Sequence, residues 1–86
     1  MKIQLNNNSI RIAVAGDNAR EISTYLVMLL NSNHVNGCSY FDHTSDEFII
    51  EAVGDNLNIY HALLQIQEES TQEYYTIWII KTQLIN

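Results

Sequence analysis

The apolar positions near the start of the chain change from the period of a strand to the period of a helix. In residues 9–15 every second side chain is a branched apolar one, which predicts a strand with one buried face. After residue 18 the apolar side chains recur at helical spacing, which predicts a helix with one buried face. The members of this helical series are Ile22, Tyr25, Leu26, Leu29 and Leu30.

The second half of the chain repeats this order of elements. Residues 38–43 have the pattern of a short strand, and a tight turn near Thr44-Ser45 joins them to a second strand at residues 46–53. A second helix follows, and residues 73–85 are a long run rich in aromatic and branched side chains, which is typical of a strand. The apolar face predicted for the second helix consists of Leu57, Tyr60, Leu63 and Leu64.

The tripeptide Gly-Asp-Asn stands at each change from strand to helix, at residues 16–18 and again at 54–56. The repeat predicts one α+β domain over residues 1–86, built from two βαβ-like half-repeats at about 9–42 and 46–84. Glycine permits a sharp turn out of a strand, and Asp or Asn caps the helix that follows. A phosphate-binding loop is disfavoured, because the glycine spacing of such loops is absent and the aspartates would repel phosphate.

The order βαββαβ predicts a ferredoxin-like sandwich, an α+β fold in which two helices cover one face of a four-stranded antiparallel sheet. Residues 2–5 resemble an extra N-terminal strand, joined as a hairpin through the asparagines at 6–8. In the ferredoxin order the strand at 9–15 already has a neighbour on both sides. Either the first strand is long and bulged at the asparagines, or the order of the sheet differs.

Composition and cysteine content set the class of protein. The chain has 86 residues, of which 47% are hydrophobic and 16% charged, as expected of a domain with a packed core. No apolar run approaches the roughly 18 residues of a membrane span, and the N-terminus lacks the apolar stretch of a signal peptide. The single cysteine, Cys38, cannot form an internal disulfide. We therefore expect a cytoplasmic protein that does not bind membranes.

The turns at residues 14–18 and 52–56 resemble, at the level of the fold, those of regulatory ACT domains, in which a strand-to-helix turn holds a small ligand. This resemblance implies binding of a small effector near the two turns. RNA-recognition modules share the topology, but they need a basic strand motif that carries aromatic residues. Here Phe48 lies among acidic residues and the net charge is −6, so direct binding of nucleic acid is disfavoured.

Three residues near the middle of the chain, His34, Cys38 and His43, offer ligands for a metal, with Asp42 adjacent. Their spacing matches no zinc signature, and in an extended segment Asp42 and His43 would face opposite ways. The same residues, or His61 as a base, offer a cysteine–histidine pair for catalysis. A lone cysteine on a strand is more often a small buried hydrophobe, and the sequence supplies no oxyanion hole. These observations predict a protein without metal, cofactor or enzymatic activity.

Charge is distributed unevenly along the chain. Eight acidic residues and no Lys or Arg lie between positions 42 and 73. They form either a solvated face or a surface that binds a basic partner. Glu68 and Glu69 favour the second interpretation. Negative charge near a helix C-terminus is unfavourable by about 0.3–1 kcal/mol, and locally unfavourable residues are expected at functional sites. The predicted partner-binding residues are Asp42, Asp46, Glu47, Glu51, Glu68, Glu69 and Glu73. Glu51 has an alternative role, as an ion-pair partner of Arg11 on an adjacent strand.

Both rows of side chains in the last predicted strand are apolar, so both faces of this strand need cover. Helices cover only one face of the predicted sandwich. Either a second copy or another partner covers the other face, or the segment at 2–5 folds over it. A homodimer would use Tyr74, Trp78 and Ile80.

Together these features predict a small acidic protein that binds and inhibits a basic, nucleic-acid-handling protein. In size and acidity the chain is similar to phage-type anti-defence inhibitors, such as anti-CRISPR or antirestriction proteins, and to toxin-neutralising proteins. The alternative is an ACT-like regulatory domain that binds a small effector.

Overall fold

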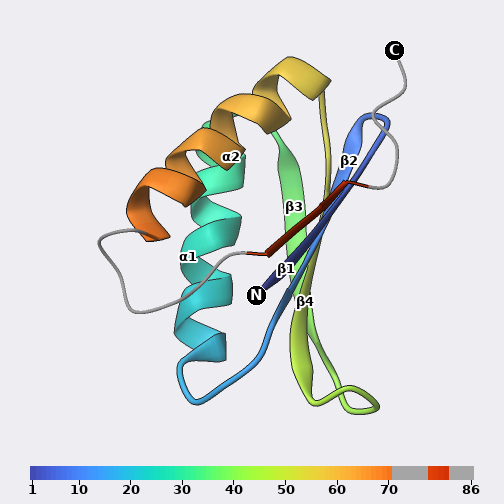
Figure 1. Ribbon diagram of the computed structural model, residues 1–86, viewed down its shortest axis with the longest axis vertical. Coiled ribbons are helices and arrows are strands. Elements are labelled where there is room, and N and C mark those ends of the chain that lie inside the picture. Colours follow the sequence, from blue (N-terminus) through green and yellow to red (C-terminus); the bar gives the residue numbers. More distant parts are fainter. Residues whose placement is uncertain (71–77, 82–86) are drawn as a thin grey trace.

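The computed structural model describes the backbone of residues 1–70 and 78–81 and the side chains of residues 1–68. Five strands and two helices follow one another along these parts of the chain (Figure 1). The elements are β1 (Lys2–Asn6), β2 (Ser9–Val14), α1 (Ala19–Ser32), β3 (Asn36–Asp42), β4 (Glu47–Val53), α2 (Asn56–Ser70) and β5 (Trp78–Lys81).

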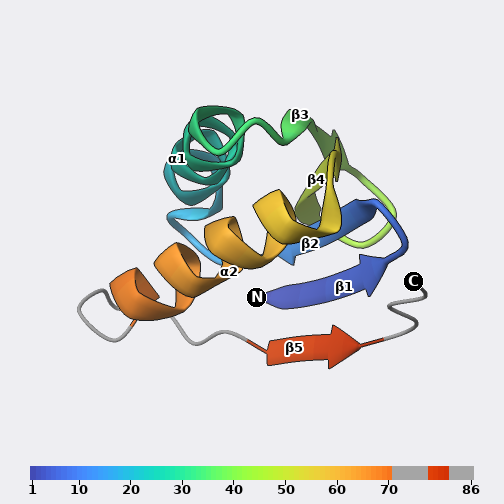
Figure 2. The same ribbon diagram turned by 90° about the horizontal axis from the view of Figure 1, so that it is seen from above.

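The strands form one sheet in the order β3-β4-β2-β1-β5. The three pairs β3–β4, β4–β2 and β2–β1 are antiparallel, whereas β5 is parallel to β1. Both helices lie on the same side of the sheet (Figures 1 and 2). The predicted α+β class is therefore confirmed, with two helices on one face of a four-stranded antiparallel sheet.

The N-terminal segment forms a separate strand, and this strand lies inside the sheet. β1 pairs with β2 through a hairpin, with Asn6 opposite Ser9, and its other edge pairs with β5. In the ferredoxin order the strands at the positions of β2 and β5 would be neighbours, so β1 is an insertion between them. The insertion is stabilised by burial, because Ile3 and Leu5 are 0% and 3% exposed and join the main core.

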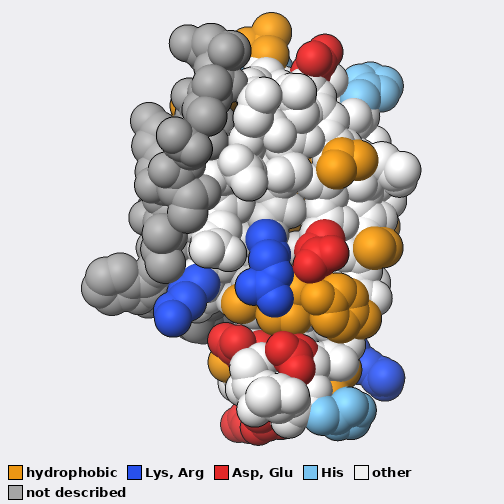
Figure 3. Space-filling view, turned by 90° about the vertical axis from the view of Figure 1, so that its right-hand side faces the viewer, with side chains coloured by type: hydrophobic (Ala, Val, Ile, Leu, Met, Phe, Trp, Pro, Cys, Tyr) orange, Lys and Arg blue, Asp and Glu red, His pale blue; other side chains and the backbone are white. Residues whose placement is uncertain are grey.

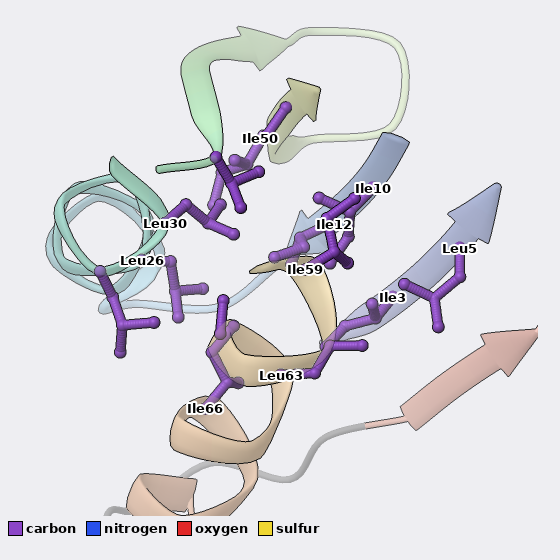
Figure 4. Close-up of a cluster of buried hydrophobic side chains, with 14 of the residues drawn as sticks. Ile3, Leu5, Ile10, Ile12, Leu26, Leu30, Ile50, Ile59, Leu63 and Ile66 are labelled. Carbon is purple, nitrogen blue, oxygen red and sulfur yellow. The ribbon is translucent and has the colours of Figure 1, made fainter. Parts of the chain in front are cut away.

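A single apolar core fills the space between the sheet and the helices (Figure 4). Alternate residues of the strands contribute to it, as expected of a sheet covered on one side. The largest contributors are Ile3, Leu5, Ile10, Ile12, Ile50, Leu26, Leu30, Ile59, Leu63 and Ile66.

The buried face of α1 agrees with the sequence pattern, but the buried face of α2 does not. In α1, Leu26, Leu29 and Leu30 are buried and Ile22 is partly buried, whereas Tyr25, which the spacing also placed on this face, is 40% exposed. In α2, the spacing predicts Leu57, Tyr60, Leu63 and Leu64 on the buried side, yet three of these four residues are exposed and only Leu63 is buried. The core side of α2 consists of Ile59, Ala62, Leu63 and Ile66. The helix has apolar residues on two faces, so its own periodicity does not decide which one packs on the sheet.

The two Gly-Asp-Asn sequences turn the chain but do not cap the helices with their asparagines. Gly16 has φ 107°, a backbone conformation that favours glycine. Asn18 precedes α1 without a side-chain capping hydrogen bond, so the predicted cap is wrong there. The side chain of Asn56 serves a tertiary contact instead of a cap.

Asn56 clamps the β1–β2 turn to the start of α2. Its Oδ1 accepts a hydrogen bond from the backbone N–H of Asn8 at 2.8 Å, and its Nδ2 donates to Oδ1 of Asn7 at 3.0 Å. The backbone N–H of Gly54 adds a third bond by donating to the carbonyl oxygen of Asn8 at 3.0 Å. These contacts join segments that lie almost 50 positions apart in the sequence.

We expect Asn56→Ala to destabilise the fold by about 1–2 kcal/mol, because two hydrogen bonds of about 0.5–1.5 kcal/mol each are lost. Asn58→Ala is the matched control, since Asn58 lies in the same turn of α2 and forms no side-chain hydrogen bond among the described residues. Urea unfolding of the two variants and the wild type measures the difference. Equal free energies of unfolding for the two variants would show that the clamp contributes nothing.

Candidate partner-binding surface

The face of the sheet opposite the helices is open in the described part of the structure. Figure 3 looks onto this face, in which basic and acidic side chains lie side by side near the middle. Strand register brings together residues from four strands in two rows. One row runs Cys38, Glu51, Arg11 and Gln4, and the next runs Tyr40, Ile49, Ala13 and Lys2.

Arg11, Glu51 and Tyr40 form a hydrogen-bonded cluster at the centre of the open face. The hydroxyl of Tyr40 donates to Oε2 of Glu51 at 3.1 Å, and Nε of Arg11 lies 3.5 Å from the same oxygen. A hydrogen bond with Tyr40 is the main cause that raises the pKa of Arg11, with a smaller contribution from Glu51. The ion-pair alternative for Glu51 is thus confirmed. Because the side chains of Arg11 and Glu51 are 45% and 52% exposed, we expect the pair to contribute only about 0–1 kcal/mol.

Beside the cluster, the open face carries a buried large apolar residue. Ile49 is 1% exposed although it lies outside the main core cluster. It is directly opposite Tyr40 on one side and Ala13 on the other. Tyr40 was not among the residues predicted from the sequence. A signal was present, because Tyr40 lies two residues before the predicted Asp42 in an alternating strand and so shares its face.

Two shallow hollows flank this cluster and share Gln4 and Arg11. The larger has a volume of about 410 Å³ and the smaller about 230 Å³. The larger is lined by Gln4, Asn6, Ser9, Ile10, Arg11, Glu51, Ala52 and Val53. The smaller is lined by Lys2, Gln4, Arg11, Ala13 and Glu47. These linings provide hydrogen-bonding groups of both charges for a surface contact.

Three of the predicted partner-binding residues gather at the β3–β4 hairpin, and we call Asp42, Asp46 and Glu47 the hairpin acids. They lie at the end of the sheet that is lowest in Figures 1 and 3. Among the described residues, no Lys or Arg lies within ion-pair distance of Asp46 or Glu47. The hairpin also carries aromatic rings, since the ring of Phe41 contacts those of His43 and Phe48 at centroid distances of 4.8 and 5.1 Å.

The other predicted site residues do not join the hairpin acids. Glu68 is exposed near the end of α2, and the side chain of Glu69 and all of Glu73 lie outside the described residues. The structure does not describe the side chains of the predicted dimer residues. Tyr74 lies outside the described residues, and for Trp78 and Ile80 only the backbone is described. Their backbones lie opposite Lys2 and Gln4 in the β1–β5 register.

The candidate metal and nucleophile residues are spread along β3. His34 precedes the strand and His43 follows it, so the strand separates them. Cys38 is a free, exposed thiol, and the expectation of a buried cysteine is wrong. Within the described residues, no group of three His, Cys, Asp or Glu side chains is placed to hold a metal ion.

The geometry also separates the two turns on which the effector-binding alternative rests. β2 and β4 are antiparallel, with Val14 opposite Phe48 and Ser9 opposite Val53. The turns that follow these strands therefore lie at opposite ends of the sheet. They do not form one ligand site within this chain.

Comparison with known proteins gives a similar fold but no family. No protein-family model matches the sequence, and no curated protein matches it. A crystal structure of the essential ribosomal processing protease Prp from S. aureus, in complex with a covalently linked product peptide, is similar over 94% of this chain and 96% of that chain. The sequence identity is 14% and the TM-score is 0.49. At these values the likeness assigns no activity, substrate or site residue to this chain.

The prediction that the chain is not an enzyme is contradicted by this comparison, because the structural neighbour is a protease. The prediction rested on the lack of a catalytic pattern in the sequence. Catalytic groups are recognised by their geometry in the folded protein, and they come from positions with no fixed spacing. A missing pattern therefore does not exclude an enzyme.

No helix among the described residues is both long enough and apolar enough to span a membrane.

We expect Tyr40→Ala to lower the free energy of unfolding by about 1–3 kcal/mol, because it removes an aromatic side chain and uncovers Ile49. Tyr40→Phe keeps the ring and loses the hydrogen bonds of the hydroxyl with Glu51 and Arg11, so it should cost about 0.5–1 kcal/mol. Urea unfolding compares the two. If both variants cost the same, the ring of Tyr40 does not cover Ile49.

We expect the carboxyl group of Asp42 to titrate below the usual 3.8, because a hydrogen bond from the backbone N–H of Thr44 at 3.0 Å lowers its pKa. A lowered pKa in the folded state contributes stability above the pKa of the unfolded state, and this stability is lost as the pH falls through the folded pKa. Carbon NMR titration of Asp42 in the folded protein and in urea measures the two values. A folded value equal to or above the unfolded one would contradict the role of this hydrogen bond.

Proposed function

We propose that the chain is a protein-binding protein of the cytoplasm that docks a basic, nucleic-acid-handling partner on its β3–β4 hairpin and inhibits it. The observation that carries this proposal is the hairpin itself. It combines three carboxylates, two of them without a cationic partner among the described residues, with the exposed ring of Tyr40, which lies on the same face of the sheet as Asp42 and Glu47.

Each part of this surface has a role that is familiar in protein association. Clustered carboxylates attract a basic surface over a distance and so raise the rate of encounter. Exposed aromatic rings then supply apolar contact area, and aromatic residues are enriched among the residues that dominate binding energy. Tyr40 is 44% exposed on the open face, so part of its ring is available for contact beside the hairpin acids, whereas the ring of Phe41 packs against Phe48 on the opposite face.

The charge of the hairpin indicates the chemistry of the partner. Proteins that bind nucleic acid place Lys and Arg side chains along the phosphate backbone. A compact group of carboxylates competes with phosphate for the same side chains, which explains how the chain would displace nucleic acid from its partner. The net charge of −6 adds to the attraction.

The test uses the chain as bait in an extract of the cell that produces it, followed by kinetic measurements with the captured protein. The bait variant is Asp46→Asn/Glu47→Lys, in which Asn suits the positive φ of 59° at position 46. We expect the captured protein to be basic, to lose nucleic-acid binding when the wild-type chain is added, and to associate about tenfold more slowly with the variant at low salt.

The matched control is Asp55→Asn/Glu68→Lys, which changes the net charge by the same amount away from the hairpin. This control should bind with nearly the wild-type rate. If the association rate falls equally in the two double variants, only the overall charge of the chain matters. A captured protein that binds the hairpin variant as tightly as the wild type, independently of salt, would overturn the proposal.

A further inference from the structure

The outer edge of β3 is an unprotected sheet edge in the described structure. β3 is the first strand of the sheet order and pairs only with β4 among the described strands. Figure 2 places it at the edge farthest from β5. Natural edge strands are commonly blocked by lysine, proline or a bulge. The sequence of β3, NGCSYFD, has neither Lys nor Pro, and its seven residues pair with β4 in unbroken register.

A side-chain contact identifies which backbone groups point outward. The N–H of Gly37 donates to Oδ1 of Asn31 in α1 at 3.1 Å, so it does not point toward β4. In an antiparallel ladder the direction alternates along the strand, so the N–H and C=O groups of Ser39 and Phe41 also point to the free edge. The β1–β2 turn leads to the same assignment. Its two-residue loop makes Asn6 and Ser9 a hydrogen-bonded pair, and alternation from this pair across β2 and β4 again leaves the N–H and C=O groups of Gly37, Ser39 and Phe41 pointing away from β4. No described residue bonds the outward groups of Ser39 or Phe41.

We propose that a second copy of this chain pairs with β3 in antiparallel fashion, about a two-fold axis at Tyr40, and joins the two sheets into one. In this arrangement Ser39 of each copy is opposite Phe41 of the other. The N–H and C=O groups of these two residues then form four hydrogen bonds across the axis. Strand addition of this kind gains affinity from main-chain hydrogen bonds.

The local side chains favour this register over its neighbour. An axis at Ser39 would place the C=O of Phe41 opposite the N–H of Gly37, and that N–H is already bound to Asn31. An axis at Tyr40 needs no group from Gly37. It also makes Tyr40 and its copy a non-hydrogen-bonded pair, in which side chains lie closest and aromatic pairs are favourable.

No two like charges face each other across the axis in this register, although each copy carries a net charge of −6. Asp42 is the only charged residue in β3, and it lies opposite Cys38 of the second copy instead of a second Asp42. Since the strands are antiparallel, the hairpin acids of the two copies lie at opposite ends of the joined edge. This dimer pairs the backbone of β3, whereas the hairpin site depends on the hairpin acids. The two share Tyr40, so a partner bound at the hairpin and a second copy at the β3 edge compete for this residue, and the variants of each test change different residues. The dimer is distinct from one through Tyr74, Trp78 and Ile80.

The first test replaces one outward N–H. Ser39→Pro removes a donor that the β3–β4 ladder does not use, and proline is tolerated on an edge strand where its missing N–H faces outward. Ser39→Ala is the matched control, because it keeps the N–H. Sedimentation across a concentration series should give dimers for the wild type and Ser39→Ala and monomers for a Ser39→Pro variant with wild-type circular dichroism. A monomeric wild type at every concentration, or a dimeric Ser39→Pro variant, would overturn the proposal.

The second test reads the register and does not depend on the folding of the proline variant. In Cys38→Ser/Tyr40→Cys the two new thiols lie across the axis, at a Cα separation of about 4.5 Å, which a disulfide can span. In the wild type the two Cys38 residues would be about 13 Å apart along the paired strands, which is too far. Mild oxidation should therefore cross-link the variant and leave the wild type uncross-linked. Equal cross-linking of both proteins, or of neither, would contradict an axis at Tyr40.

Discussion

Pairing of β1 with β2 places Ile3 opposite Ile12 and Leu5 opposite Ile10, and the remaining architecture depends on this contact. It adds two fully covered side chains to the core at a position where a ferredoxin-like sheet has none. It also moves β5 away from β2, so that the last strand pairs in parallel with the first. The hydrogen bonds from Asn56 to the β1–β2 turn then tie the start of α2 to the same hairpin.

Because both helices pack on one face, the sheet presents two surfaces with different constraints. On the helix side, the position of each apolar residue is determined by burial, which contributes about 25 cal/mol per Å². On the open side, the half-exposed ion pair of Arg11 and Glu51 contributes little to stability, and Ile49 is the large apolar side chain that is buried there among the described residues. Residues on the open face, on the hairpin and along the β3 edge are therefore under weaker folding constraints. These are the places where a binding surface can develop at little cost to the core.

The candidate site could be predicted only where it depends on neighbours in the sequence. Asp42, Asp46 and Glu47 lie within one hairpin, so their clustering follows from the tight turn that the pattern around Thr44 indicates. The role of Glu51 required the register of β4 against β2, which the sequence left as an alternative. The contact of Tyr40 with Glu51 joins the neighbouring strands β3 and β4, and alternation in β3 alone does not identify which residue of β4 is the partner. Inhibition of a basic partner stays a prediction.

The sequence by itself determined the order of strands and helices, the α+β class and the buried face of α1, because these follow from local periodicity and from turn residues. Tertiary structure alone decided where β1 enters the sheet, which of two apolar faces of α2 is buried, and that Asn56 holds a distant turn instead of capping its helix. The physical reason is the same in each case. The alternatives have similar local propensities, and they differ only in the contacts that they make with segments far away in the chain.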